Sequence, residues 1–197
     1  MHPQEDLYGL VIAGGKSSRM GMDKAMLNYH GLPQQYYLYE MLKSMCSKVY
    51  ISCNKSQAAQ INKEYNIIED LNTFNDIGPM AAILSAFHYH PEKNFVVVGC
   101  DYPFLTKNDL EGFISSIEET DKPKTFFNEK ENLYEPMLGY YPHDLLPSLK
   151  EAYDAGNTSL QKILKINNAG KFSPLNITAI KSVDTEEDYQ ATRNMIG

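Results

Sequence analysis

Cysteine is scarce in this chain of 197 residues, which contains only Cys46, Cys53 and Cys100. Their odd number and the lack of a C-x-x-C spacing argue against a disulfide framework and against a zinc knuckle. We therefore expect reduced and mostly buried thiols. Glycine and proline are also few, at 12 and 10 residues, while 43% of the residues are hydrophobic. This composition excludes a disordered or collagen-like chain and indicates a globular protein.

Long apolar runs and an excess of positive charge are also missing. The longest uncharged apolar run near the N-terminus, residues 7–15, is far shorter than the about 20 residues that a membrane span needs. Glu5 and Asp6 precede this run, where a signal peptide would carry basic residues, so we expect a cytoplasmic protein without a membrane partner. The net charge of −7 argues against a nucleic-acid partner, because proteins bind that polyanion chiefly through positive charge.

Strand and helix patterns alternate along the first half of the chain. Apolar runs typical of strands occupy residues 7–12, 49–53, 67–68 and 95–100, and helical spacing is found at 34–45, 80–89 and 107–118. Residues 95–98 are apolar without alternation, as expected of a central strand that is covered on both faces. The alternation predicts an α/β fold with a mostly parallel sheet and helices on both of its sides.

The second half is less regular. Its pattern predicts strands at 125–127, 134–141 and 176–180, and helices at 144–153 and from about Thr185 onward. Thr106 and Thr185 are each followed by an aspartate three residues later, which is typical of a helix N-cap. We find no repeat and no low-complexity linker, so we expect a single domain over residues 1–197.

The strongest candidate site directly follows the first predicted strand and reads Ile12-Ala13-Gly14-Gly15-Lys16-Ser17-Ser18-Arg19-Met20-Gly21-Met22-Asp23-Lys24. Glycines at the carboxyl end of a strand let backbone N–H groups cradle phosphate oxygens. Residues 7–30 hold three cations and one acid, a net charge of +2, and Arg19 is one of only two arginines in the chain. The glycine positions fit neither a Walker A loop nor a G-x-G-x-x-G fingerprint. The segment therefore predicts a phosphate-binding loop of another kind, in which the role of Lys16 stays open.

Polar residues at other predicted strand ends extend this candidate site. Asp101 ends the most apolar strand and is suited to Mg²⁺, which prefers one or two carboxylates together with phosphate oxygens and water. Asp70 can accept hydrogen bonds from a base, and the Gly78-Pro79 turn opens a helix whose small residues allow close approach of a ligand. Asn54 is a candidate for base or sugar recognition, although a simple asparagine turn explains its position equally well.

Taken together, these motifs resemble a known family. The chain is similar to the molybdenum cofactor guanylyltransferases, the MobA family, in five blocks in the expected order: I-A-G-G-K-S-S-R-M-G-M-D-K, G-P-M-A-A-I, G-C-D-Y-P-F-L, Y-E-P-M-L-G-Y-Y and V-D-T-E-E-D-Y. The resemblance spans nearly the whole chain. It implies a Rossmann-like three-layer αβα nucleotidyltransferase fold, with a nucleotide-binding half at about 1–105 and an acceptor-binding half at about 106–197.

The resemblance also implies roles for individual residues. The nucleotide-binding set that it implies is Ile12, Ala13, Gly14, Gly15, Lys24, Asn54, Asp70 and Asp101, with Asp101 also binding Mg²⁺ and Arg19 lying beside the triphosphate. The catalytic candidates are Arg19, Lys24 and Asp101. The closing segment departs from the family's N-x-N-T-P pattern: Ser182 and Asp184 replace the asparagines, and Glu186 replaces the proline. Contacts to the pterin are therefore not carried over.

The activity that the resemblance implies is the transfer of GMP from GTP to molybdopterin cofactor, with release of pyrophosphate. Its substrates are GTP and the molybdopterin cofactor, and proteins that deliver the cofactor and molybdoenzyme chaperones are candidate further partners. The attacking phosphate is already ionised at neutral pH, so the protein has to position groups and neutralise charge. Two alternatives stay open: a related transferase that uses CTP or a sugar-phosphate acceptor, and a non-catalytic nucleotide-sensing domain, which the altered segment 182–186 suggests.

Overall fold

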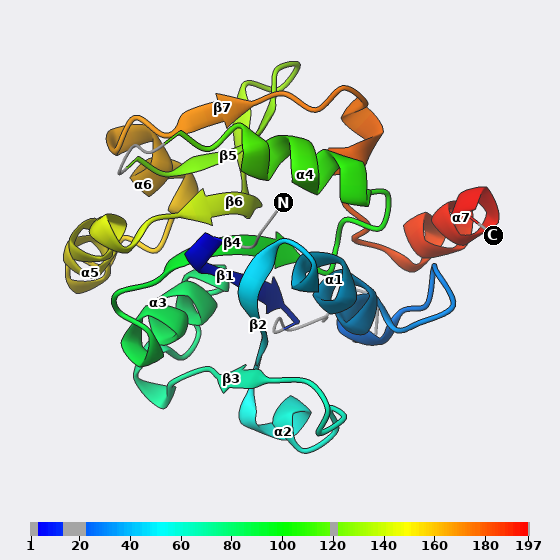
Figure 1. The fold of residues 1–197 in the computed structure, drawn as a ribbon, viewed down its shortest axis with the longest axis horizontal. Coiled ribbons are helices and arrows are strands. Elements are labelled where there is room, and N and C mark those ends of the chain that lie inside the picture. The colour runs from blue at the N-terminus through cyan, green and yellow to red at the C-terminus, as the bar shows by residue number, and fades with distance from the viewer. Residues whose placement is uncertain (1–3, 14–22, 119–121, 197) are drawn as a thin grey trace.

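The computed structural model describes residues 4–13, 23–118 and 122–196. Within these ranges seven strands form one sheet in the order β3-β2-β1-β4-β6-β5-β7 (Figure 1). The strands are β1 (Gln4–Ile12), β2 (Cys46–Cys53), β3 (Ile67–Glu69), β4 (Asn94–Gly99), β5 (Lys124–Asn128), β6 (Leu133–Tyr141) and β7 (Gly170–Phe172). Strand β6 is antiparallel to both of its neighbours, and every other pairing is parallel. The sheet is therefore mostly parallel, as the sequence predicts.

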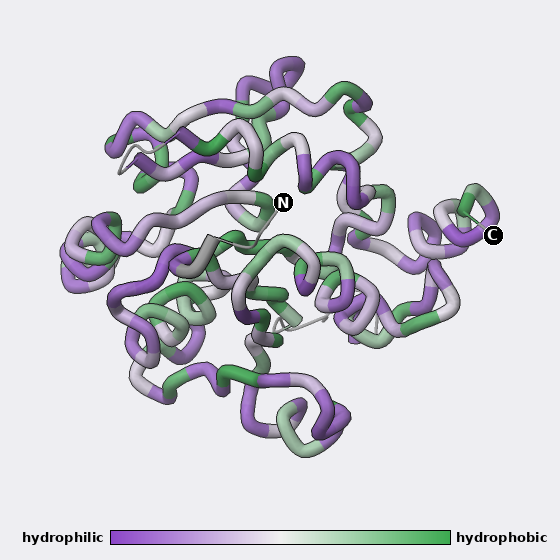
Figure 2. The backbone as a smooth tube through the Cα atoms, viewed as in Figure 1, coloured by the Kyte–Doolittle hydropathy of each residue, from purple (hydrophilic) through white to green (hydrophobic). Residues whose placement is uncertain are grey.

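Helices cover both faces of this sheet, which confirms the three-layer architecture. Helices α1 (Gln34–Lys43) and α4 (Lys107–Ser115) pack in one apolar cluster, while α3 (Pro79–Tyr89), α5 (Leu146–Asp154) and α6 (Leu160–Ile166) pack in another. Strand β4 contributes to both, since Val96 and Val98 belong to the first cluster and Phe95 and Val97 to the second. Figure 2 shows apolar chain around β1 and β4, in the middle of the molecule. The unbroken apolar run of β4 is thus explained by burial on both faces.

The order of the strands creates a point at which the chain changes direction across the sheet. From β1 the chain adds β2 and β3 on one side, then returns to place β4 on the other side of β1. Ile12 is in register with both Ser52 of β2 and Gly99 of β4, so the three strands end at one level. Ligands of open α/β sheets bind outside the carboxyl ends of the strands at such a point. Residues that follow these strands are therefore brought together.

Several details of the structure differ from the sequence-based expectations. The strand expected at 176–180 is wrong: Asn176 caps the short helix η4 (Ile177–Ile180), and its side chain accepts a hydrogen bond from the Thr178 N–H. The helix expected at 144–153 is preceded by a separate turn, η3 (His143–Leu145), because Pro147 opens α5. Helix α6 and strand β7 were not predicted, and neither was α2 (Lys55–Ala58); all three are short.

The expected helix caps and thiols are confirmed. Thr106 forms a capping box with Asp109 at the start of α4. Thr185 and Asp188 exchange hydrogen bonds at the start of α7 (Glu186–Ile196), the helix that lies at the end of the molecule near the C-terminus (Figure 1). All three cysteines are free and buried. Among the described residues, no helix has the length and apolarity that a membrane crossing requires.

Candidate functional site

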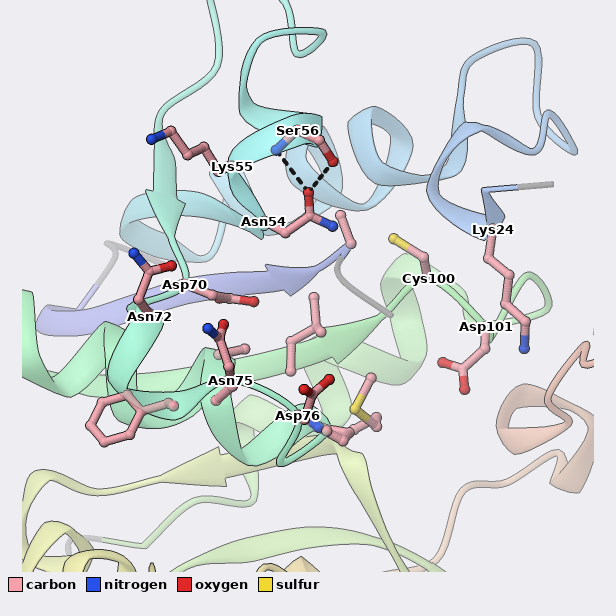
Figure 3. Close-up of a pocket in the computed structure, with 18 residues that line it drawn as sticks. Lys24, Asn54, Lys55, Ser56, Asp70, Asn72, Asn75, Asp76, Cys100 and Asp101 are labelled. Atoms are coloured by element: carbon pink, nitrogen blue, oxygen red, sulfur yellow. Dashed lines mark hydrogen bonds between the residues drawn. The ribbon is translucent and has the colours of Figure 1, made fainter. Parts of the chain in front are cut away.

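A cavity of about 870 Å³ opens at the carboxyl edge of β1, β2, β3 and β4 (Figure 3). It brings together six of the residues that the sequence singles out: Ile12, Ala13, Lys24, Asn54, Asp70 and Asp101. Its wall also includes Gly78, Pro79, Ala81 and Ala82 at the start of α3. The predictions for Gly14, Gly15, Lys16 and Arg19 lie in residues 14–22, outside the described part of the chain.

Asp101 lies just beyond β4, beside Lys24 in Figure 3. Its Oδ1 atom is buried and has no hydrogen-bond partner in the described part of the chain. Gly99 makes room for this oxygen, because a Cβ at residue 99 would lie 2.5 Å from Asp101 Oδ1. A side chain at residue 99 would therefore displace the Asp101 carboxylate and the end of Met137. Gly99 belongs to a motif noted in the sequence, but the sequence alone predicts no role for it.

The electrostatics of Asp101 suit a site that receives a cation. Burial raises the pKa of Asp101 to about 6, and Lys24 and a backbone hydrogen bond only partly oppose this rise. The carboxylate is thus mostly ionised at neutral pH but poorly solvated, and a buried charged oxygen without a partner is costly. The described residues contain no group of three histidine, cysteine or acidic side chains that would hold a metal by themselves. A metal at Asp101 would accordingly take most of its ligands from phosphate and water.

Lys24 is held by a residue far away in the sequence. Its Nζ lies 2.5 Å from Oδ1 of Asp184, in the segment that departs from the family pattern. The hydrogen bond from Lys24 lowers the pKa of Asp184. The segment is also tied to the metal candidate, since the Val183 N–H donates to the Asp101 carbonyl at 2.8 Å. The C-terminal segment is therefore in contact with both catalytic candidates that the structure describes.

A small apolar cluster anchors this C-terminal segment. Val183 packs with Leu27 and Tyr29, which follow Lys24 in the chain, and Tyr189 of α7 packs against them. The rings of Tyr29 and Tyr189 meet edge to face with centroids 5.3 Å apart. The chain that follows Lys24 and the chain before α7 thus pack together beside the cavity.

Asp70 follows β3 and points its carboxylate into the cavity (Figure 3). The buried Ser52 hydroxyl donates a hydrogen bond of 2.6 Å to Asp70 Oδ1, which fixes the orientation of the carboxylate. Burial raises the pKa of Asp70, and the Ser52 hydrogen bond partly offsets that rise. The Ser52 bond to Oδ1 leaves Oδ2 as the carboxylate oxygen with which Asp70 can accept a hydrogen bond from a ligand of the cavity. Ser52 was not singled out from the sequence, although it lies in the Ser52-Cys53-Asn54 strand end.

Asn54 combines the two interpretations that the sequence left open. It lines the cavity, and it is also the N-cap of α2, where its Oδ1 accepts from the N–H groups of Ser56 and Gln57 and from the Ser56 hydroxyl. The cap leaves the amide Nδ2 as the polar group with which Asn54 can contact a ligand. Asn54 is therefore set up as a donor, in contrast to the acceptor Asp70.

The start of α3 approaches the cavity through small residues. Gly78 has a positive φ of 65°, a conformation that side chains with a Cβ rarely adopt. Pro79 then occupies the first turn, where its missing N–H costs nothing. This geometry explains the Gly78-Pro79 turn and places Ala81 and Ala82 in the cavity wall.

A second cavity of about 380 Å³ lies in the other half of the molecule. Glu135 of β6 and Ser182 are among its lining residues. Glu135 accepts a hydrogen bond of 2.8 Å from the hydroxyl of the buried Tyr102, which directly follows Asp101. Ser182 donates to Asp184 Oδ2 at 2.9 Å, and Asp184 in turn holds Lys24. The second cavity is therefore connected to the first through both catalytic candidates.

Comparison with known proteins decides the family. The model of the MobA-like NTP transferase domain matches residues 9–172, most of the chain. The chain belongs to this family. Its members are nucleotidyltransferases, and the match runs from the second half of β1 to the end of β7 and includes the residues that line the first cavity. The family assignment made from the sequence motifs is thus confirmed.

Relatives of this MobA-like chain carry related names. It is 32% identical over 190 residues to a molybdenum cofactor biosynthesis bifunctional protein of Synechocystis, with 94% of the chain and 53% of that protein aligned. The chain thus spans about half the length of this relative. It is also 28% identical over 156 residues to the molybdenum cofactor guanylyltransferase of Pseudomonas entomophila, covering 79% of the chain and 80% of the relative.

Solved structures with lower identity show the same fold. Molybdopterin-guanine dinucleotide biosynthesis protein A from Archaeoglobus fulgidus superposes with a TM-score of 0.77 at 20% identity, over 95% of this chain and 97% of that one. A CMP:2-keto-3-deoxy-manno-octonic acid synthetase solved with CTP gives a TM-score of 0.75 at 14% identity, over 97% and 98%. The nucleotidyltransferase fold predicted for the MobA-like chain is therefore confirmed.

Proposed function

We propose that this MobA-like nucleotidyltransferase transfers GMP from GTP to molybdopterin cofactor and releases pyrophosphate. The observation that carries the proposal is the meeting of Lys24, Asp70 and Asp101 in one cavity at the carboxyl ends of β1, β3 and β4. This cavity offers a cation and a buried carboxylate at one end and a hydrogen-bond acceptor at the other. The names of the relatives, several of them molybdenum cofactor guanylyltransferases, support the choice of acceptor.

The reaction joins a terminal phosphate oxygen of the cofactor to the α-phosphorus of GTP and breaks the bond from that phosphorus to the β-phosphate oxygen. Pyrophosphate takes away the electron pair of the broken bond. Lys24 neutralises charge on the phosphates, and Arg19, from residues 14–22, is proposed to do the same. The backbone of Ile12, Ala13, Gly14 and Gly15 orients the nucleotide. This chain therefore positions the two phosphates and stabilises charge, without a covalent enzyme intermediate.

Mg²⁺ fits the proposed site at Asp101. The buried and unpartnered Oδ1 of this residue is the hard, ionised oxygen that the ion prefers, and few other protein ligands are available there. When bound, the ion would supply neutralisation of the phosphate charge. Asp101 contributes the carboxylate, for which Gly99 leaves room, and the Val183 N–H bond to the Asp101 carbonyl holds the backbone at this residue.

Guanine is the base that the other end of the cavity suits best. Asp70 offers an oriented carboxylate oxygen, which pairs with the N1–H and 2-amino donors of guanine. Asn54 offers an amide donor, because its oxygen is occupied by the α2 cap. A base that lacks an adjacent pair of donors would make fewer hydrogen bonds to the Asp70 carboxylate and should bind less tightly.

We assign the acceptor to the half of the chain from residue 106 onward. The second cavity, with Glu135 and Ser182, lies there and is linked to Lys24 through Asp184. We also propose delivery proteins and molybdoenzyme chaperones as further partners in the cytoplasm. The support for this is a relative whose name places it in molybdenum cofactor biosynthesis.

The nucleotide preference is tested by thermal unfolding with Mg²⁺ and each of GTP, CTP, ATP and UTP. We expect GTP to raise the midpoint most, and inosine triphosphate, which lacks the 2-amino group, to raise it less. A larger shift with CTP would contradict the guanine assignment and support the alternative of a transferase that uses CTP. A synthetase solved with CTP has the same fold.

A further inference from the structure

One glutamine connects the two ends of the phosphate-binding segment. Gln57 Nε2 donates to Asp23 Oδ2 at 2.8 Å and to the Ala13 carbonyl at 3.3 Å. Ala13 and Asp23 are the residues immediately before and after residues 14–22. Nine residues of sequence are thus bridged by a single side-chain amide from another element, α2.

The other atom of the same amide reaches the base-binding end. Gln57 Oε1 accepts a hydrogen bond of 3.1 Å from the Asn54 N–H and completes the capping box of α2. Every polar group of the amide is therefore used, and it joins the end of β1, the start of η1 (Lys24–Met26) and the cap that orients Asn54. Helix α2 itself has no buried residue, so core packing does not explain the placement of Gln57.

The bond to Asp23 acts on Lys24 through the backbone. Asp23 caps η1, where its Oδ1 accepts from the Ala25 N–H at 3.0 Å, and Gln57 holds its other oxygen. Both oxygens of Asp23 are thus fixed, and Lys24 is the next residue in the chain. Because the backbone next to Lys24 is already fixed, Lys24 loses less conformational freedom when a triphosphate binds. This preorganisation lowers the entropic cost of binding.

We propose that Gln57 is a positioning residue that clamps the ends of the phosphate-binding segment and places Lys24 for the triphosphate. The clamp rests on the proposed nucleotide site, because it assigns Lys24 to phosphate. Its Nε2 contacts the chain on either side of residues 14–22, and these two bonds act on phosphate binding, while the separate Oε1 bond belongs to the cap of α2. Glutamine is required at this position because a glutamate would complete the capping box equally well but would have no N–H to donate to Asp23 or Ala13.

Gln57→Glu therefore separates the clamp from the cap. Binding of GTP and of guanosine is measured by calorimetry with Mg²⁺ for the wild-type protein, Gln57→Glu and the charge-matched control Gln60→Glu, whose exposed side chain lies just beyond α2. We expect Gln57→Glu to weaken GTP binding at least tenfold and to leave guanosine binding within twofold. Gln60→Glu should leave both within twofold. Equal weakening of GTP and guanosine, or unchanged GTP binding, would overturn the clamp.

A swapped pair tests the contact without any nucleotide. Gln57→Glu places two carboxylates together, and Asp23→Asn places two amide donors together, so each should lower the midpoint of thermal unfolding. The double variant restores a hydrogen bond with donor and acceptor exchanged, and we expect it to recover at least half of the loss. Additive losses in the double variant would contradict the contact. If the wild-type protein binds no guanine nucleotide, the proposed function fails, while this cycle still decides whether the clamp exists.

Discussion

Lys24 Nζ lies 2.5 Å from Asp184 Oδ1, although 160 residues separate the two in the sequence. The side chain of Lys24 is 23% exposed and that of Asp184 is 54% exposed, so the pair sits at the rim of the site. The cation proposed to bind phosphate thus already has an anionic partner in the ligand-free protein. An incoming triphosphate has to share Lys24 with Asp184 or displace it.

Replacing Asp184 by asparagine should tighten nucleotide binding in the absence of Mg²⁺. The variant removes a competitor for Lys24 and a negative charge that repels the triphosphate. Exposed ion pairs contribute at most about 1 kcal/mol, so we expect a gain of roughly twofold to fivefold in GTP affinity, measured by calorimetry at low salt. Glu187→Gln, an exposed change of the same charge on α7, is the control and should stay within twofold. Weaker binding of GTP by Asp184→Asn would contradict this competition.

Gly99→Ala should disturb Asp101 because the new methyl group would lie 2.5 Å from its Oδ1 and 2.9 Å from the terminal methyl group of Met137. The carboxylate has to move, and we expect at least a tenfold loss of Mg²⁺-dependent nucleotide binding together with a lower midpoint of unfolding. Thermal unfolding with and without GTP and Mg²⁺ measures both effects.

The same substitution in α4 provides a matched control. Gly112 is exposed, and a Cβ there would meet only the Phe172 ring at 3.8 Å, an ordinary contact. Gly112→Ala should therefore stabilise the protein by roughly 0.5–1 kcal/mol through helix propensity and leave nucleotide binding unchanged. If both glycine variants behaved alike, the close approach at Gly99 would have no functional meaning.

Asp101→Asn should stabilise the metal-free protein at high pH. Burial raises the pKa of Asp101 in the folded state to about 6 from the ordinary 3.8, so the folded protein is penalised once this carboxyl ionises. The contribution of Asp101 to the free energy of unfolding is therefore largest below pH 3.8, where the carboxyl is protonated in both states. It is lost as the pH rises through 6, where the folded protein has to ionise the buried group. The variant should gain on the order of 3 kcal/mol at pH 8, and the gain should vanish towards pH 4. Urea unfolding at both pH values checks this, and a gain of equal size at both would refute the burial of a charged Asp101.

Ser52→Ala should change the pH dependence of GTP binding through Asp70. The Ser52 hydrogen bond opposes the rise in the pKa of Asp70 that burial causes, so its removal should raise that pKa further. If GTP binding needs the ionised Asp70 carboxylate, then on acidification the variant should lose GTP binding at a higher pH than the wild-type protein does. Affinity titrations between pH 4 and 8 locate the two midpoints.

Ser47→Ala on the same strand is the control for this shift. The Ser47 hydroxyl donates to the Leu7 carbonyl, away from the cavity, so its removal should leave the midpoint of GTP binding in place. A Ser52→Ala curve that coincides with the wild-type curve would show that Asp70 does not depend on its serine.

The central sheet could be predicted because its signals are local. The apolar run before Asp101 and the glycines after β1 identify strands and the edge at which they end, and parallel strands place those ends together. The capping box at Thr106 was equally readable, because its two residues are three apart. The strand expected at 176–180 is wrong, because the Asn176 side chain caps a helical turn there.

The contacts that complete the site depend on distance in space and had no signal in the sequence. The pairing of Lys24 with Asp184 links the two ends of the chain, and no spacing rule predicts it. Gln57 looks like an ordinary polar residue of a short surface helix until its amide is seen between Ala13 and Asp23. The role of Gly99 depends on which way the Asp101 side chain turns.

The most direct test of the central claim is the release of pyrophosphate from GTP, measured in the presence of Mg²⁺ and molybdopterin cofactor. The wild-type protein should release one pyrophosphate for each guanine dinucleotide formed, and none without the cofactor. Folded Lys24→Ala and Asp101→Ala proteins should lose this activity. Tight GTP binding without pyrophosphate release by the wild-type protein, or near wild-type turnover in both variants, would contradict the account.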